Sequence, residues 1–204
     1  RSEGELSVKT KDTPQIYQIK VTLNDIKPPI WRRLLVSSVV SLSKFHDILQ
    51  IAMGWTDSHL HQFVVHGACY GVPDADYGDD MRDESRVQLC RLLKKEKDSL
   101  VYEYDFGDSW EHHVVLEKIL PMAKGTQLPQ CIKGNRACPP EDVGGPYNYP
   151  DFLKAIRNKA HPQHEDYIEW IGEDFDPEHF DVEEINELLT KFCRARSRGK
   201  SDRA

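Results

Sequence analysis

The sequence predicts an α+β protein built on a β-grasp-like mixed sheet. The prediction rests on the order of the patterned segments, on a long hairpin with one apolar face, and on helical stripes that flank these strands. The segments of the predicted sheet core follow the order strand, strand, helix, strand, hairpin, at 17–24, 30–36, 43–53, 59–66 and 100–120. Three C-terminal helical patterns are expected to pack on this sheet, at 151–158, 164–172 and 181–192.

The first two strands are defined by alternation and by the turn between them. Apolar residues occupy every second position from Tyr17 to Leu23, which is typical of a strand with one buried face. Pro28 and Pro29 interrupt the pattern, because proline cannot donate to a strand ladder. We therefore expect a turn at 25–29, followed by an antiparallel strand.

The first helix is predicted from its two ends and from the stripe between them. Ser43 is a residue type that caps helix N-termini, and Gly54 suits a helix C-terminus. The residues at helical spacing are Phe45, Ile48, Leu49, Ala52 and Met53. After the strand at 59–66, residues 67–86 are predicted to form a long acidic loop, and 87–93 fit either a short helix or a strand.

The hairpin at 100–120 permits a test of strand register. A three-residue loop (107–109) would pair Phe106 with Trp110 and Tyr104 with His112. One face would then carry Tyr102, Tyr104, Phe106, Trp110, His112, Val114 and Leu116, and the carboxylates would lie on the other face. A slip of one residue would mix the two sets, so the apolar pattern favours this loop over one of two residues.

The remaining chain is predicted to contain more loop than sheet. Residues 121–150 are rich in loop signals, and in the last helix Asp181 and Glu184 have the spacing of a capping box. We expect a single domain at 15–192, with its sheet core at 15–120 and its loop and helical part at 121–192. A disordered lead-in at 1–14 and a basic disordered tail at 193–204 would flank it.

Composition excludes several classes of protein. A net charge of -7 with 30% charged residues gives no overall case for wrapping nucleic acid. No stretch approaches the roughly 18–20 apolar residues of a membrane span, so no membrane partner is expected. Five cysteines without a regular framework are typical of reduced thiols, which favours a cytoplasmic protein.

Five motifs occur together in a combination that is more specific than any one of them. They are Pro29-Ile30-Trp31-Arg32-Arg33, Met53-Gly54-Trp55, His59-Leu60-His61-Gln62-Phe63, Tyr104-Asp105-Phe106-Gly107-Asp108-Ser109-Trp110-Glu111-His112 and Arg136-Ala137-Cys138-Pro139-Pro140-Glu141-Asp142-Val143-Gly144-Gly145. This set resembles the plasmid pRiA4b ORF-3-like family over nearly the whole chain. The resemblance implies an α+β domain found on plasmids and other mobile elements. It implies no activity, because the family is essentially uncharacterised.

Histidines and carboxylates near the hairpin form a candidate site for a divalent metal ion. The candidate ligands are His59, His61, Asp105, Asp108, His112 and Glu141, and Asp142 is a further carboxylate candidate nearby. His59 and His61 lie two apart on a predicted strand, so both should face one side. Imidazole with carboxylate suits zinc, iron or manganese. The structural alternative is that His61 and His112 are hydrogen-bonded core imidazoles and that Asp108 serves the turn.

The Pro- and Gly-rich segment at 139–147 predicts a rigid lid over the sheet. Its carboxylates Glu141 and Asp142 are expected to pair with arginine, the candidates being Arg32, Arg33 and Arg136. We expect a groove between the 100–120 hairpin and the 131–149 loop. Its candidate lining residues are Trp31, Arg33, His61, Tyr104, Trp110, His112, Glu141, Asp142 and Tyr147.

Two functional hypotheses follow from these residues. The first is a non-enzymatic accessory or binding module whose groove takes a protein, a peptide or a nucleic acid. The alternative is a metal-dependent hydrolase or related enzyme, in which three ligands leave a coordination position open. No residue is assigned a catalytic role by the sequence, and elemental analysis of the purified protein would separate the two hypotheses.

Overall fold

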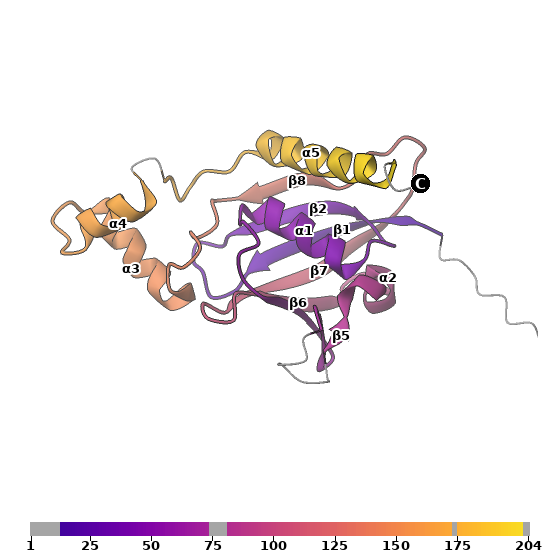
Figure 1. The fold of residues 1–204 in the computed structure, drawn as a ribbon, viewed down its shortest axis with the longest axis horizontal. Helices are drawn as coiled ribbons and strands as arrows, with labels where there is room; N and C mark the ends of the chain where they lie inside the picture. The colour runs from indigo at the N-terminus through magenta and orange to yellow at the C-terminus, as the bar shows by residue number, and fades with distance from the viewer. Residues whose placement is uncertain (1–12, 74–80, 173–174, 202–204) are drawn as a thin grey trace, which may run out of the picture.

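The centre of the structure is a mixed β-sheet to which both halves of the chain contribute. The computed structural model describes residues 13–73, 81–172 and 175–201. The sheet has eight strands in the order β5-β4-β3-β6-β7-β1-β2-β8 (Figure 1). Their bounds are β1 Gln15–Leu23, β2 Trp31–Ser37, β3 His61–Val65, β4 Ala68–Gly71, β5 Arg82–Asp83, β6 Ser99–Tyr104, β7 Trp110–Pro121 and β8 Gln130–Asn135. Neighbouring strands are antiparallel except for the parallel pair β4 and β5. The predicted α+β class is confirmed.

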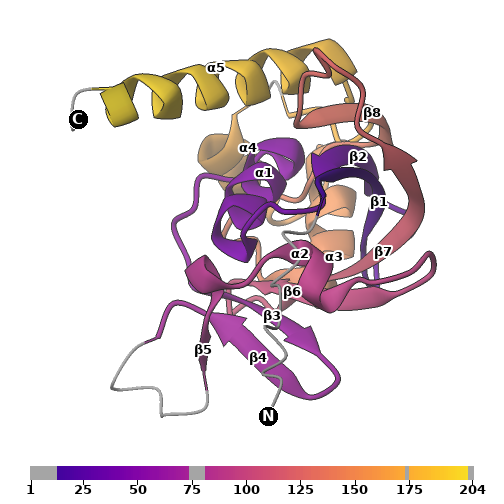
Figure 2. The same cartoon turned by 90° about the vertical axis from the view of Figure 1, so that its right-hand side faces the viewer.

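The helices cover one side and one end of this sheet. They are α1 Leu42–Met53, η1 Glu84–Arg86, α2 Leu89–Leu92, α3 Gly145–Arg157, α4 His164–Ile171 and α5 Val182–Ser201. Figure 2 shows α1 on the concave side of the curved sheet, with α5 above it. In Figure 1, α5 runs along β8, and α3 and α4 lie beyond the end of the strands. No helix in the described ranges is both long and apolar enough to cross a bilayer.

The predicted helix at 43–53 is present, with a different first residue. Ser41, not Ser43, is the N-cap, and its hydroxyl accepts a hydrogen bond from the backbone N–H of Lys44. Leu42 N–H also bonds Val87 O at 2.9 Å, which ties the start of the helix to a later segment. Gly54 ends the helix at φ 98, a left-handed conformation that glycine adopts without a Cβ penalty.

The hairpin register differs from the predicted one by two residues. Tyr104 pairs with Trp110 and Tyr102 with His112, so the loop holds five residues rather than three. A shift of two keeps each side chain on its predicted face, because the strand repeat is also two. Six of the seven predicted inward residues are buried, and Phe106 is exposed in the loop. Asp105 is also buried, although it was predicted to face outward.

Two elements occur in the segment predicted to be loop. β8 pairs antiparallel with β2 and extends the sheet beyond residue 120. It buries only Cys131 fully, so its sequence lacks the alternation that identifies a half-buried strand. Helix α3 begins at Gly145 rather than at Asp151, with Pro146 in its first turn, where proline is well tolerated.

The boundaries at the two ends are partly described. β1 begins at Gln15, and residues 1–12 of the predicted lead-in lie outside the described residues, as do 74–80 of the predicted acidic loop. Helix α5 continues to Ser201, which lies within the predicted tail at 193–204. Residues 202–204 are outside the described part of the chain.

Candidate functional site

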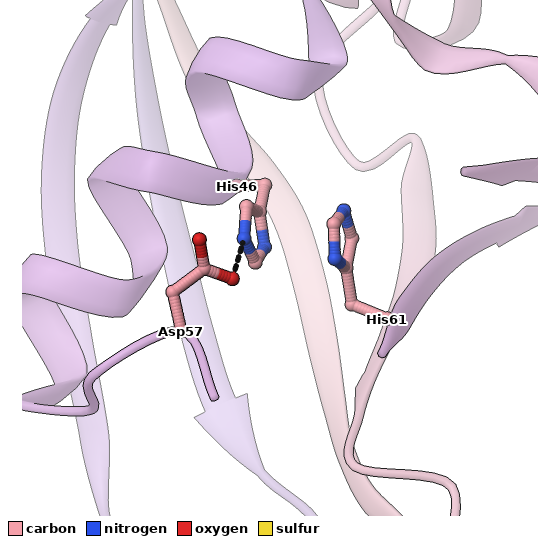
Figure 3. A group of neighbouring side chains, drawn as sticks. All are labelled: His46, Asp57 and His61. Atoms are coloured by element: carbon pink, nitrogen blue, oxygen red, sulfur yellow. Dashed lines mark hydrogen bonds and ion pairs between the residues drawn. The ribbon is translucent and has the colours of Figure 1, made fainter. Parts of the chain in front are cut away.

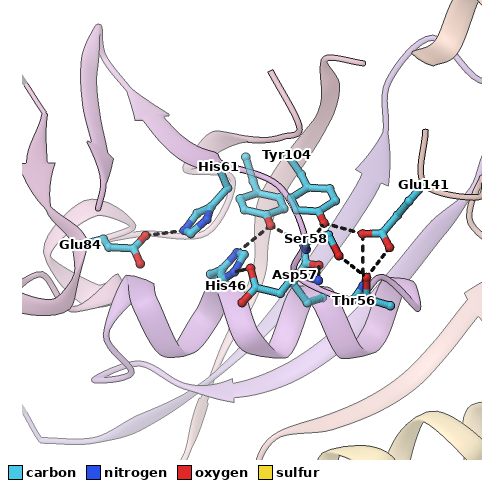
Figure 4. A network of polar contacts seen from close by, with 10 residues as sticks. His46, Thr56, Asp57, Ser58, His61, Glu84, Tyr104 and Glu141 are labelled. Atoms are coloured by element: carbon cyan, nitrogen blue, oxygen red, sulfur yellow. Dashed lines mark hydrogen bonds and ion pairs between the residues drawn. The ribbon is translucent and has the colours of Figure 1, made fainter. Parts of the chain in front are cut away.

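A network of hydrogen-bonded polar side chains lies between α1 and the sheet (Figure 4). His46 comes from α1, His61 from β3, Glu84 from η1 and Tyr102 from β6. His61 Nε2 lies 2.8 Å from Glu84 Oε2, and His46 Nδ1 lies 2.8 Å from the Tyr102 hydroxyl. These residues therefore come from two strands and two helices that are far apart in sequence.

The two histidines of this network stack on each other. Their ring centroids are 3.4 Å apart and their planes differ by 5° (Figure 3). Burial lowers the pKa of His46, and the neighbouring His61 lowers it further, although hydrogen bonding to Asp57 opposes both effects. Burial and the neighbouring imidazole therefore both favour the neutral form of His46.

Hydrogen bonds fix the tautomer of His46. The Gln50 amide donates to the Tyr102 oxygen at 2.9 Å, and burial raises the pKa of Tyr102 well above its ordinary value. The Tyr102 hydroxyl hydrogen therefore points to His46 Nδ1, and Nε2–H donates to Asp57 Oδ1 at 2.8 Å. Both ring nitrogens of His46 are occupied.

A second cluster lies at the junction of three turns and contains His59, Asp105 and Asp142. One ligand atom from each residue lies within 4.8 Å of the other two. His59 Nε2 is 3.4 Å from Asp142 Oδ1, and Nδ1 is 3.7 Å from Asp105 Oδ2. His59 Nε2 is enclosed and has no hydrogen-bond partner among the described residues. Asp142 is 71% exposed, so the cluster opens to solvent.

The hairpin loop orients Asp105 toward this cluster. Asp105 has φ 60, and its Oδ1 accepts the backbone N–H groups of Gly107 at 2.9 Å and Asp108 at 3.3 Å. Its own backbone N–H donates to Leu60 O at 2.8 Å, which places it beside the turn that carries His59. With Oδ1 used by the loop, Oδ2 is the oxygen that faces His59.

The 136–144 loop is attached directly to the hairpin and to the end of α1. Gly144 N–H donates to Asp108 Oδ2 at 3.0 Å, and the Trp55 indole N–H donates to Pro139 O at 2.9 Å. Tyr104 donates to Glu141 Oε1 at 2.5 Å, and the Thr56 hydroxyl donates to Glu141 Oε2. Burial raises the pKa of Glu141, but these hydrogen bonds outweigh it, so the net pKa shift is downward. Glu141 is therefore an anionic anchor for the loop.

The predicted metal ligands divide among separate places. His59 and Asp105 meet, but His61 joins the His46 network, because β3 starts at His61 and strand alternation does not extend back to His59. Asp108 and Glu141 are used in loop contacts. His112 lies in the core with no exposed surface and bonds Tyr102 O through Nδ1 at 3.2 Å. Burial lowers its pKa to about 4.

The predicted groove residues also divide. Trp31 and Arg33 lie on the sheet face opposite Arg32, where Arg33 forms an ion pair with Glu117 at 2.6 Å. Tyr104 and Trp110 are buried on the α1 side, and Tyr147 is 94% exposed on α3. The hairpin and the 136–144 loop contact each other where the groove was predicted. Arg136 likewise pairs with Glu178, not with Glu141 or Asp142.

Sequence reasoning missed three residues of the network, namely His46, Asp57 and Glu84. His46 and Gln50 are four residues apart within the apolar stripe of α1, which places both on one helix face. A buried polar pair of this kind is a usable signal. Asp57 and Glu84 lie in turns that no periodicity describes.

The matches to known proteins extend over almost the whole described chain. Residues 15–184 match the model of the plasmid pRiA4b ORF-3-like protein family. The chain belongs to this family. The predicted resemblance is confirmed.

The relatives of this chain include one that is similar in sequence and one whose structure has been solved. The uncharacterized protein y4hQ of Sinorhizobium fredii (strain NBRC 101917 / NGR234) is 38% identical over 185 residues, covering 88% of this chain and 95% of y4hQ. The crystal structure of MM3350, a protein of unknown function from Methanosarcina mazei Go1, is 35% identical with a TM-score of 0.76. That match covers 83% of this chain and 97% of MM3350. Neither description states an activity.

Proposed function

We propose that the protein binds a divalent metal ion through His59, Asp105 and Asp142 and uses it in metal-dependent hydrolysis. The observation that carries the proposal is the enclosed His59 Nε2, which lacks a hydrogen-bond partner among the described residues and faces a carboxylate at 3.4 Å. A metal ion would satisfy this nitrogen beside Asp142, and it would offset the charge of Asp105, whose Oδ2 lies on the Nδ1 side of the ring. One imidazole with two carboxylates suits manganese, iron or zinc.

The His46 cluster supports a metal site less well, although His46, Asp57 and His61 also bring ligand atoms within 4.8 Å. An imidazole nitrogen binds a metal through a lone pair in the plane of its ring. The stacked planes of His46 and His61 are parallel, so one ion cannot lie in both. Both nitrogens of His46 are also engaged.

The open side of the proposed centre is the reason for expecting catalysis. Three protein ligands leave a coordination position for water, which is the usual arrangement of catalytic metal sites. A divalent ion held by these three residues would supply Lewis-acid activation of a water molecule. The exposed position of Asp142 would give a substrate access to this side of the centre.

The metal can be tested without knowing the substrate. Chelator-treated protein is titrated calorimetrically with Mn²⁺ and Zn²⁺, and the His59→Ala, Asp105→Asn and Asp142→Asn variants are compared. Asp105→Asn keeps the oxygen that caps the hairpin loop. Each variant should lose more than about 100-fold in affinity, beyond the 10–100-fold typical of residues that only orient ligands. His61→Ala serves as the control and should bind like the unaltered protein.

Hydrolysis is tested separately with the metal-loaded protein, using p-nitrophenyl acetate and bis(p-nitrophenyl) phosphate as probes. Metal-dependent turnover that disappears in Asp142→Asn would support the catalytic part of the proposal. A folded protein that takes up no metal would contradict the whole proposal and favour the non-enzymatic binding module.

A further inference from the structure

A pocket independent of the proposed metal centre lies between the end of α1, the 137–141 loop and the start of α5. Its volume is about 370 Å³. We call it the α1–α5 pocket. Its lining includes Arg32, Trp55, Cys138, Phe180, Ile185 and Leu188. Most of this wall is apolar, which is typical of small-molecule sites with a few polar groups.

Arg32 is the arginine in the wall of this pocket, and it is 3% exposed. Its acceptors are neutral. Nε donates to Ala52 O at 2.7 Å, and Nη1 donates to Trp31 O at 2.9 Å and to Asn135 O at 3.0 Å. Nη2 has a long contact with Cys138 Sγ at 3.9 Å, and among the described residues no carboxylate pairs with Arg32.

The surrounding charges do not neutralise this guanidinium. Burial raises the pKa of Cys138 to about 11, so its thiol is uncharged near neutral pH. Ala52 O is a carbonyl of the last turn of α1, and a helix C-terminus supplies only about half a negative charge. A buried cation without a full counter-charge is costly, and an anionic ligand would remove that cost.

Three carboxylates also line the pocket, and each of them already has another partner. Glu141 is held by Tyr104 and Thr56, and Glu184 lies 3.0 Å from His179 Nε2. Asp181 caps α5 by accepting the N–H of Glu183 at 2.7 Å. These carboxylates are therefore engaged elsewhere, and none of them pairs with Arg32.

Gly134 permits the aromatic cover of the same guanidinium. The Phe180 ring lies 4.9 Å from Arg32 Cζ, in a cation–π arrangement. A Cβ on Gly134 would collide with this ring and would lie 2.9 Å from Trp31 O. Phe180 covers one face of the guanidinium, and Nη2 is the nitrogen that has no carbonyl acceptor among the described residues.

We infer that the α1–α5 pocket binds a small amphipathic monocarboxylate. Its carboxylate would meet the Nη2 edge of Arg32, and its apolar chain would lie along Ile185 and Leu188. Arginine suits this role because its planar fork matches a carboxylate. The pocket shares no residue with the proposed metal centre, so the two proposals stand or fall separately.

The probes are octanoate, octylamine and acetate, each titrated calorimetrically into protein kept in chelator. Octanoate should bind at least tenfold more tightly than either of the other two, because only octanoate offers both charge and chain. Equal binding of octanoate and octylamine, or no octanoate binding, would overturn the inference.

Variants of the lining residues test whether octanoate binds in this pocket. Arg32→Gln should abolish octanoate binding, but Arg32 also joins three backbone carbonyls, so this variant can fail to fold. Leu188→Glu changes a half-exposed position at the pocket and should fold normally. It should weaken octanoate binding at least tenfold, whereas Leu60→Glu, equally exposed on another surface, should not. Unaltered binding by Leu188→Glu would place the octanoate elsewhere and overturn the inference.

Discussion

His112 is an ionisable side chain with no exposed surface, and its environment determines its protonation state. Nδ1–H donates to Tyr102 O, and Trp55 packs edge-on against the ring at 5.2 Å. Nε2 lies in the interior without a partner among the described residues. A proton added there would create a charge that nothing nearby solvates. The imidazole is thus a neutral core residue, as the structural alternative of the sequence analysis anticipated.

We expect His112 to make the protein less stable in mild acid. Its folded pKa of about 4 lies below the ordinary value of 6.5, so the unfolded chain binds the proton more readily. The stabilisation is present in full above pH 6.5 and is lost as the pH falls to 4, with an upper limit of about 3 kcal/mol. Urea unfolding between pH 7.5 and 4 measures how the free energy of unfolding changes with pH.

A matched pair of variants tests whether His112 causes this pH dependence of the free energy of unfolding. His112→Asn keeps an N–H donor for Tyr102 O but does not titrate, so its free energy of unfolding should fall less steeply with acidification. His66→Asn makes the same change at an exposed position with φ 49, which asparagine tolerates. If His112→Asn and the unaltered protein show equal slopes, the assignment is wrong.

At the scale of elements, the hairpin explains why the face was predictable and the register was not. Apolar alternation specifies which side chains point inward, and any shift of two residues satisfies it equally well. Asp105 determines the register, because its side chain caps a five-residue loop and its backbone N–H bonds Leu60 O. Such an Asx contact is not distinguishable in the sequence from an outward-facing strand aspartate.

The outer edge of β8 is protected by a side chain from α5. Asn186 Oδ1 accepts Cys131 N–H at 2.8 Å, and Asn186 Nδ2 donates to Cys131 O at 2.8 Å. The amide thus takes the place of a neighbouring strand. We expect Asn186→Ala to lower the free energy of unfolding by about 1–3 kcal/mol, because two backbone groups lose their partners.

Urea unfolding and sedimentation test the role of Asn186. Thr190→Ala, one helical turn further along α5, removes an exposed hydroxyl and should change stability by less than about 0.5 kcal/mol. The Asn186→Ala protein should also associate as its concentration rises, since its edge strand is open. A variant as stable and as monodisperse as Thr190→Ala would contradict this role.

Two glycines with positive φ differ in what an added Cβ would contact, so their alanine variants distinguish backbone strain from a steric collision. Gly145 has φ 73, and a Cβ there would collide with Asp108 O in the hairpin loop. Gly54 has φ 98 with no atom within 4 Å of such a Cβ.

Gly145→Ala should push the 136–144 loop off the hairpin and weaken Mn²⁺ binding at least tenfold. Gly54→Ala should cost about 1 kcal/mol of stability and leave Mn²⁺ binding unchanged. Equal metal affinities in the two variants would show that the contact does not position Asp142.

At the scale of the whole molecule, the elements with a strong period were predictable and their long-range partners were not. The strand at Gln15–Leu23 and the helix ended by Gly54 follow from local patterns. β8 forms because β2 offers it a partner a hundred residues away, and its own sequence carries little alternation. The candidate site has the same character. His59, Asp105 and Asp142 were identified by residue type, but they meet only because the 136–144 loop returns to the hairpin.

A metal ion at this junction would stabilise the entire fold, since its ligands come from three turns separated by 46 and 37 residues. An ion present at 100 times its dissociation constant adds about 2.7 kcal/mol to the stability. For a domain of this size, that corresponds to a rise in Tm of about 5–10 °C. The measurement is thermal unfolding of chelator-treated protein with and without Mn²⁺. Asp142→Asn should remove the rise, whereas Asp151→Asn, an exposed carboxylate on α3 paired with Lys154, should retain it. An equal rise in both variants would mean that Mn²⁺ stabilises the protein from another position, and the proposed centre would then lack its physical basis.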